Sequence, residues 1–190
     1  MLPSMVMNAL IVMLVAGCVI KGLTIASPRG KLFRFFTTLS NLLLALSSAA
    51  VLACSPGELP LWTVIFKYAG TCAVTVTMLT VLLFLGPVSQ GWKGLLTGLE
   101  LILHLICPLL ALVSFIFFEK TEMPLWTLAV GVAPVLIYGA LYCCKVVFAP
   151  EERRWEDFYG FNRGGKWALS LFLMVVAAAV IAFTLWIIPA

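Results

Sequence analysis

Charged residues are scarce in this chain of 190 residues, where Asp, Glu, Lys and Arg together make up 11%. Soluble domains carry about 25% of such residues, so the scarcity excludes an ordinary soluble domain. Hydrophobic residues make up 63% of the chain, well above the soluble average of about half. We therefore expect the chain to be embedded in a membrane.

Histidine is scarcer still, because His104 is the only one. The six cysteines form no C-x-x-C pair, and this pattern predicts neither a zinc site nor a disulfide framework. A haem held by two histidines is excluded, which leaves only a single axial ligand open. We predict no metal ion and no organic cofactor.

The apolar residues fall into six blocks of about 20 residues, the length of helix that crosses roughly 30 Å of hydrocarbon. The strict alternation of short barrel strands is missing from these blocks. We predict an all-α fold, a polytopic six-transmembrane-helix bundle that forms a single transmembrane domain over residues 1–190. The predicted spans cover residues 5–22, 35–54, 61–85, 95–118, 125–148 and 167–188.

Lys and Arg are distributed unevenly over the two sides of this predicted bundle. Ten of the 12 border the first, third and fifth connections. Short loops rich in Lys and Arg stay in the cytoplasm, so both termini are expected outside. The formal charge of +4 then reflects topology, and no nucleic-acid partner is predicted. The ten are Lys21, Arg29, Lys31, Arg34, Lys93, Lys145, Arg153, Arg154, Arg163 and Lys166.

Only Lys67 and Lys120 lie near the opposite side. Lys67 is close to the end of its span, and we expect its long side chain to reach the interface with its ammonium group. Before the last span, the aromatic and glycine-rich segment 155–165 is expected to act as an interfacial clamp. Its glycines do not have the spacing of a phosphate-binding P-loop.

Polar residues inside a membrane are costly, so they indicate where a function is located. Thr37, Ser40 and Asn41 form a polar turn at the start of the second span. Glu100 and His104 are four residues apart on the fourth span, which places them on one face of a helix. These five residues are the candidate site.

His104 is expected about 14 Å deep by helix rise, near the middle of the membrane. Pro108 cannot donate to the carbonyl of His104, so the helix is expected to kink there. The imidazole either has a chemical role or joins helices by a hydrogen bond. Glu100 either orients and protonates His104 or pairs with Lys93 at the interface; both alternatives stay open.

Two short motifs carry a resemblance to a known family. They are Phe33-Arg-Phe-Phe-Thr-Thr-Leu-Ser-Asn-Leu-Leu43 on the second span and Leu103-His-Leu-Ile-Cys-Pro-Leu109 on the fourth. These motifs resemble the two signature regions of a bacterial six-span membrane family, which is similar to the eukaryotic androgen-induced-gene type of integral membrane hydrolases. The resemblance implies a location in the bacterial cytoplasmic membrane.

In the eukaryotic enzymes an intramembrane threonine and histidine cleave esters between fatty acids and hydroxy fatty acids. The resemblance therefore implies that Thr37 is the nucleophile, that His104 is the base, and that the substrate is a lipid-like ester of the membrane. Ser40 is the alternative nucleophile, and Asn41 or Ser40 could donate to the oxyanion. Thr37 is expected only about 6 Å deep, so helix tilt or Pro108 must bring it to His104.

A different class of function fits the same residues. In a small-molecule or proton-coupled membrane transporter, His104 and Glu100 would line the path and relay protons. An accessory protein, in which polar residues only hold helices together, is a third possibility. The oligomeric state does not follow from the sequence.

Overall fold

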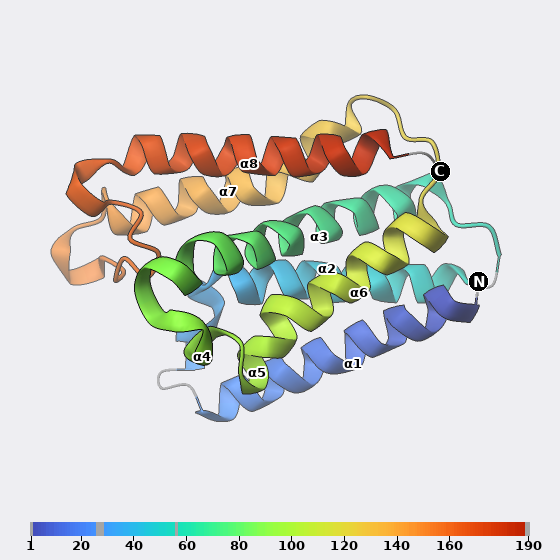
Figure 1. Ribbon diagram of the computed structural model, residues 1–190, viewed down its shortest axis with the longest axis horizontal. Helices are drawn as coiled ribbons and strands as arrows, with labels where there is room; N and C mark the ends of the chain where they lie inside the picture. Colours follow the sequence, from blue (N-terminus) through green and yellow to red (C-terminus); the bar gives the residue numbers. More distant parts are fainter. Residues whose placement is uncertain (1, 26–28, 56, 189–190) are drawn as a thin grey trace.

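The computed structural model describes residues 2–25, 29–55 and 57–188, and it is a bundle of helices (Figure 1). No β-strand occurs in these ranges, which confirms the all-α fold class. Within the same ranges, six helices are long and apolar enough to cross a membrane. The predicted spans agree with them to within a few residues. This architecture is that of an integral multi-pass membrane protein.

Four of the spans are single α-helices from end to end, and the third and fourth spans also contain π-helical segments. The helix α3 continues as a π-helical segment, Val81–Gln90, and the fourth span combines α5 and α6 with two π-helical segments, Ile102–Ile106 and Phe115–Glu119. The α-helices are α1 (Leu2–Ile25), α2 (Phe36–Cys54), α3 (Leu61–Thr80), α4 (Gly91–Leu95), α5 (Gly98–Leu101), α6 (Cys107–Ser114), α7 (Thr127–Val146) and α8 (Trp167–Ile187).

The helix α3 is the centre of the bundle and packs against α2, α6, α7 and α8 (Figure 1). Two glycines let neighbouring helices approach α3 closely. A Cβ atom on Gly70 would lie 2.8 Å from the Ser47 hydroxyl and 3.0 Å from the Leu44 Cα atom of α2. On α7, a Cβ atom on Gly131 would lie 2.8 Å from the ring of Tyr68. Such small residues let membrane helices gain van der Waals contact without a hydrophobic driving force between them.

The outward faces of the helices are apolar. Large exposed side chains on α8 include Leu169, Phe172 and Leu173, and Phe117 and Ile137 are exposed on other spans. In water such a surface would promote aggregation, but in a bilayer it is the surface that lipid tails contact. The exposed apolar surface therefore agrees with membrane insertion.

Both ends of the described chain lie at one end of the bundle (Figure 1). The segments 29–35, 81–97 and 147–166 lie at the other end, which we call the basic end because ten Lys and Arg residues border the first, third and fifth connections of the sequence. The segment 147–166 folds back there, and Glu156 pairs with Lys31 at 3.4 Å. Rings of Trp155, Phe158 and Phe161 surround Tyr142 of α7.

The expectation for Lys67 is wrong, because its side chain is 0% exposed. Its Nζ atom donates to Asn8 Oδ1 and to Ser48 Oγ, both at 2.7 Å, so the charge stays inside the bundle. Asn8 Nδ2 in turn donates to Glu119 Oε1 at 2.5 Å, and Ser4 and Ser114 also donate to that oxygen. We call these residues the outer cluster. It links α1, α2, α3 and the end of the fourth span.

Candidate active site

The second and fourth spans bring Thr37 and His104 together at the basic end. Thr37 Oγ1 lies 3.2 Å from His104 Nε2, which is within hydrogen-bonding distance. Thr37 is half-buried, whereas His104 is 5% exposed. The structure thus places the predicted hydroxyl against the predicted base.

The tautomer of His104 follows from its second ring nitrogen. Nδ1 lies 2.9 Å from the backbone oxygen of Leu95, the last residue of α4. A carbonyl oxygen can only accept a hydrogen bond, so Nδ1 carries the proton and donates it. In the neutral ring, Nε2 then has a free lone pair, and the Thr37 hydroxyl donates to it. A base needs a hydrogen bond in this direction, from the nucleophile to its lone pair, in order to remove the proton of the nucleophile.

The depth expected for His104 is wrong, and the correction explains how the pair meets. The fourth span begins at Gly98, so His104 lies about 9 Å from its start by helix rise and not near the middle of the membrane. Thr37 is the second residue of α2. Both side chains are therefore close to the same end of the bundle, and the pair meets without a gap of several ångströms that helix tilt or Pro108 would have to close.

Pro108 acts on the helix just after His104. The residues around His104 form the π-helical segment Ile102–Ile106, where the amide of Cys107 donates to the carbonyl of Ile102, and the expected kink stays a prediction. Pro108 has no amide hydrogen to continue the normal pattern, so the preceding turn widens. Such π-helical turns inside α-helices are frequent at functional sites.

Glu100 is the second ionisable group of the site. Its Oε2 atom lies 3.3 Å from His104 Nε2, and its side chain is 51% exposed. The ion pairs among the described residues do not include one with Lys93, so the geometry favours the alternative in which Glu100 acts on His104. A carboxylate at this distance stabilises the imidazolium ion and not the neutral ring with its lone pair.

Ser40 and Asn41 lie one turn further along α2 and face other groups. Ser40 Oγ lies 2.9 Å from Thr77 Oγ1 and donates to the backbone oxygen of Thr37 at 3.1 Å, and the hydrogen bonds among the described residues include none between Ser40 and His104. Asn41 Nδ2 donates to the backbone oxygens of Thr37 and Leu103 at 2.8 and 3.1 Å. Both amide hydrogens of Asn41 are therefore engaged, which leaves none for an oxyanion. Asn41 instead ties α2 to the turn that carries His104.

Tyr159 is a member of the site that sequence reasoning missed. Its hydroxyl accepts a hydrogen bond from the amide of Phe36, the residue before Thr37, at 3.1 Å. Burial raises the pKa of Tyr159, so the phenol stays protonated and can donate. The only signal in the sequence was the aromatic, glycine-rich character of segment 155–165, which gave no reason to choose one ring.

Acidic, cysteine and histidine side chains do not gather around this site. In the described ranges, no group of three or more His, Cys, Asp or Glu side chains is placed to hold a metal ion. The groups near Thr37 are a base, a carboxylate and a phenol. They are suited to proton transfer and to stabilising charge on oxygen.

No family model, curated protein or solved structure matches the chain. The family resemblance of the two motifs therefore stays a prediction, and a function has to be argued from the geometry of the site.

Proposed function

We propose that the protein is an intramembrane hydrolase of lipid-like esters. The observation that carries this proposal is the 3.2 Å contact between Thr37 Oγ1 and His104 Nε2, together with the bond from His104 Nδ1 to Leu95 that fixes the tautomer. An unassisted hydroxyl is a poor nucleophile, and a base held against it in the correct tautomer is the usual means of activation.

The reaction begins when Thr37 Oγ1 attacks the ester carbonyl carbon while His104 Nε2 takes the hydroxyl proton. Negative charge moves to the carbonyl oxygen, to which we assign the Tyr159 hydroxyl as donor, and Glu100 stabilises the imidazolium ion. When the intermediate collapses, the departing alkoxide takes the proton from His104 and an acyl-threonine remains. Water, deprotonated by His104, then hydrolyses this ester and restores Thr37 and the neutral imidazole.

The position of the pair supports a substrate that is already in the membrane. Thr37 begins α2 and His104 lies about 9 Å into its span, so the pair is near the boundary between headgroups and hydrocarbon. The ester carbonyls of membrane lipids lie at that depth. We also propose that the basic end is cytoplasmic, because the Lys and Arg asymmetry supports that orientation.

The test is covalent labelling and ester turnover by the purified protein. Thr37→Val keeps the shape but removes the hydroxyl, and His104→Ala removes the base, so each should abolish labelling by a fluorophosphonate probe and hydrolysis of a medium-chain nitrophenyl ester. The double variant should be scarcely slower than either single one, since the two groups act as a unit. Thr37→Ser should retain part of the activity.

Ser40→Ala is the matched control, because Ser40 is on the same helix and its hydroxyl bonds Thr77 and the Thr37 carbonyl instead of His104. It should keep labelling and turnover near the parental level. Loss of labelling in Ser40→Ala with retention in Thr37→Val would transfer the nucleophile to Ser40. Parental turnover in both Thr37→Val and His104→Ala would decide against the hydrolase.

A second candidate function is proton-coupled transport, and the observation that favours it is the 3.3 Å pair of His104 and Glu100. Glu100 is half-exposed and His104 is buried, as in a relay that carries a proton from solvent into the bundle. The same variants separate the two functions. A transporter should lose activity with His104→Ala and keep it with Thr37→Val, whereas the hydrolase should lose activity with both.

A further inference from the structure

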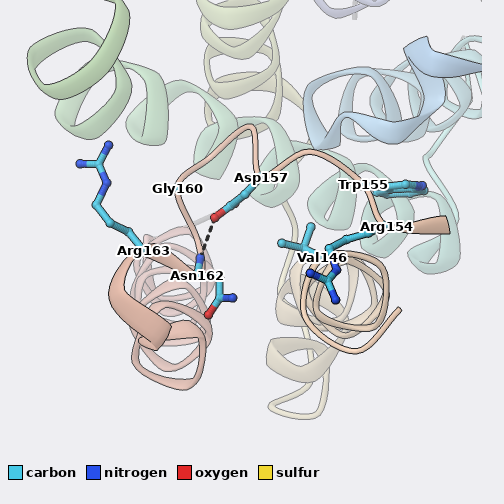
Figure 2. A pocket seen from close by; sticks show the side chains of 7 residues that line it. All are labelled: Val146, Arg154, Trp155, Asp157, Gly160, Asn162 and Arg163. Atoms are coloured by element: carbon cyan, nitrogen blue, oxygen red, sulfur yellow. Dashed lines mark hydrogen bonds between the residues drawn. The ribbon is translucent and has the colours of Figure 1, made fainter. Parts of the chain in front are cut away.

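A hollow of about 460 Å³ lies where the segment between α7 and α8 crosses the basic end (Figure 2). It is separate from the Thr37 and His104 pair, since neither residue lines it. Figure 2 shows Arg154 and Arg163 on opposite sides, with Asp157 and Asn162 between them. The lining residues are Val146, Arg154, Trp155, Asp157, Gly160, Asn162 and Arg163.

Neither arginine of this hollow is neutralised by a carboxylate. Arg154 donates from Nε and Nη2 to one backbone oxygen, that of Ala149, at 3.3 and 3.2 Å. Within the described ranges, the guanidinium group of Arg163 has no ion pair. Each arginine has five N–H donors, so most of them are free for a ligand.

Asp157 also lines the hollow, but its oxygens are already engaged. Oδ1 accepts hydrogen bonds from the amide of Phe161 at 2.8 Å and the hydroxyl of Tyr142 at 3.1 Å. Oδ2 accepts from the amide of Asn162 at 2.8 Å (Figure 2). This carboxylate therefore holds the loop in shape and does not cancel the charge of the arginines. Glu151 and Glu152 are on the same segment but do not line the hollow.

Asn162 restricts the chemical class of the ligand that can bind in this hollow. Its Oδ1 atom is buried and has no hydrogen-bond partner among the described residues. A buried acceptor without a partner is costly, so a ligand that fills the hollow should bring a donor to it. A phosphate diester has only acceptors. The ligand therefore needs an O–H or N–H group in addition to its phosphate.

We propose that this hollow binds the headgroup of an anionic phospholipid that carries a hydroxyl group, such as a phosphoglycerol. The arginines bind the phosphate oxygens, for which the guanidinium fork is well matched, and Asn162 Oδ1 accepts from the hydroxyl. The place is suitable, because the hollow lies between the ends of two apolar spans. There Phe148 and Trp167 pack with ring centroids 5.2 Å apart, beside the surface that acyl chains contact.

The proposal can be tested by titrating the purified, delipidated protein with single lipids and counting bound lipids by native mass spectrometry. Phosphatidylglycerol should bind at least about tenfold more tightly than phosphatidylcholine, which has no net charge and no headgroup donor. Arg154→Gln and Arg163→Gln should each weaken phosphatidylglycerol binding about tenfold, the effect of losing one charge-assisted hydrogen bond. Arg153→Gln is the matched control on the same segment and should stay within about twofold of the parent.

Asn162→Leu tests the hydroxyl separately from the charge. It should weaken binding of phosphatidylglycerol but leave binding of phosphatidylmethanol, a phosphate diester without a headgroup hydroxyl, unchanged. Among the described residues, the altered side chains make no hydrogen bond except those of Arg154 to Ala149, so thermal unfolding should match the parent in all variants but Arg154→Gln. If Arg163→Gln unfolds at the same temperature as the parent, its weaker lipid binding cannot be explained by misfolding.

Three outcomes would overturn the proposal. If Arg153→Gln weakens binding as much as Arg163→Gln, only diffuse charge is at work. If phosphatidylcholine binds as tightly as phosphatidylglycerol, the hollow does not recognise the headgroup. If soluble glycerol phosphate displaces phosphatidylglycerol at equal concentration, the site serves a free organic phosphate and not a lipid.

Discussion

The two polar clusters of this bundle lie at opposite ends and are built differently. In the outer cluster, Lys67 and Glu119 are both buried, and Asn8 bridges them by accepting from the ammonium group and donating to the carboxylate. At the basic end, Thr37 is half-buried and the lone pair of His104 Nε2 faces its hydroxyl. One cluster compensates its charges internally, and the other keeps a reactive pair within reach of the surface.

This difference shows how polar groups with structural and chemical roles can be distinguished in a membrane bundle. A group whose hydrogen bonds all run to other helices fixes the packing of those helices, and any movement would leave a charge in an apolar medium. A hydroxyl and a base that contact each other near the surface can exchange a proton without breaking the fold. We therefore expect variants of the outer cluster to change stability and variants of the basic-end pair to change activity.

The largest expected effect is on stability, from Lys67→Met. This change removes the ammonium group and leaves Glu119 buried without a compensating charge, which costs about 3–5 kcal/mol when one partner of a buried pair is lost. Reversible unfolding in mixed micelles measures the free energy of unfolding. Adding Glu119→Gln to Lys67→Met should recover part of the loss, because the uncompensated carboxylate is then gone.

Lys21→Met is the control for this prediction, since Lys21 is exposed and should contribute less than about 1 kcal/mol. Folded Lys67→Met protein should still be labelled at Thr37. The contrast between the clusters would fail if Lys67→Met unfolded like Lys21→Met, or if the folded variant had lost probe labelling.

The next effect is on activity, from Tyr159→Phe. The change removes the hydroxyl that binds the Phe36 amide next to Thr37, and loss of one donor to an oxyanion lowers turnover by about 100-fold. Tyr68→Phe is the matched control, because the Tyr68 hydroxyl donates to the Ala182 carbonyl at 2.7 Å in the bundle interior. Both variants should lose about 1 kcal/mol of stability, and only Tyr159→Phe should lose activity.

The pH dependence of turnover is a second test of the role of Tyr159. Burial raises the pKa of this phenol above its usual value near 10, so the neutral, donating form is favoured and turnover should not fall between about pH 8 and 10 through its ionisation. A Tyr159→Phe enzyme with parental turnover would remove the phenol from the mechanism. The Thr37 and His104 pair would then have to rely on another donor.

The fold was predictable because hydrophobic length alone determines where a helix can cross a membrane. Even the ends of α3 and α8 follow from the sequence to within a few residues. The burial of the Lys67 ammonium group was not predictable in the same way. A lysine near a span end can reach the interface by its length, and only the positions of Asn8 and Ser48 on other helices keep it inside.

The pairing of Thr37 with His104 came from the resemblance of two motifs, since no spacing rule relates residues on different spans. The depth of His104 was overestimated because Leu95 is apolar and looks like the start of a span, although it ends α4 and its carbonyl binds the imidazole. Tyr159 comes from a loop, where hydropathy carries no information about contacts. Such long-range contacts depend on how the loop folds over the bundle.

The smallest effect is expected from Glu100→Gln, and it tests what the carboxylate does for His104. Glu100 Oε2 is 3.3 Å from His104 Nε2 and should stabilise the imidazolium ion that forms when Thr37 loses its proton. The side chain is 51% exposed, so water screens the interaction, and a loss of about 1 kcal/mol or less corresponds to at most about fivefold slower turnover. Glu122→Gln, an exposed change at the opposite end, is the control and should have no effect.

Salt separates an electrostatic role of Glu100 from direct proton transfer. The screening length falls from about 30 Å at 0.01 M to about 3 Å at 1 M, so the difference in turnover between Glu100→Gln and the parent should shrink as salt is added. A role in carrying the proton would instead give a large loss that salt does not change, because the amide of Gln cannot accept and release a proton. A salt-independent loss of 100-fold or more would therefore assign Glu100 to a proton relay with His104, which is the arrangement that the transporter requires.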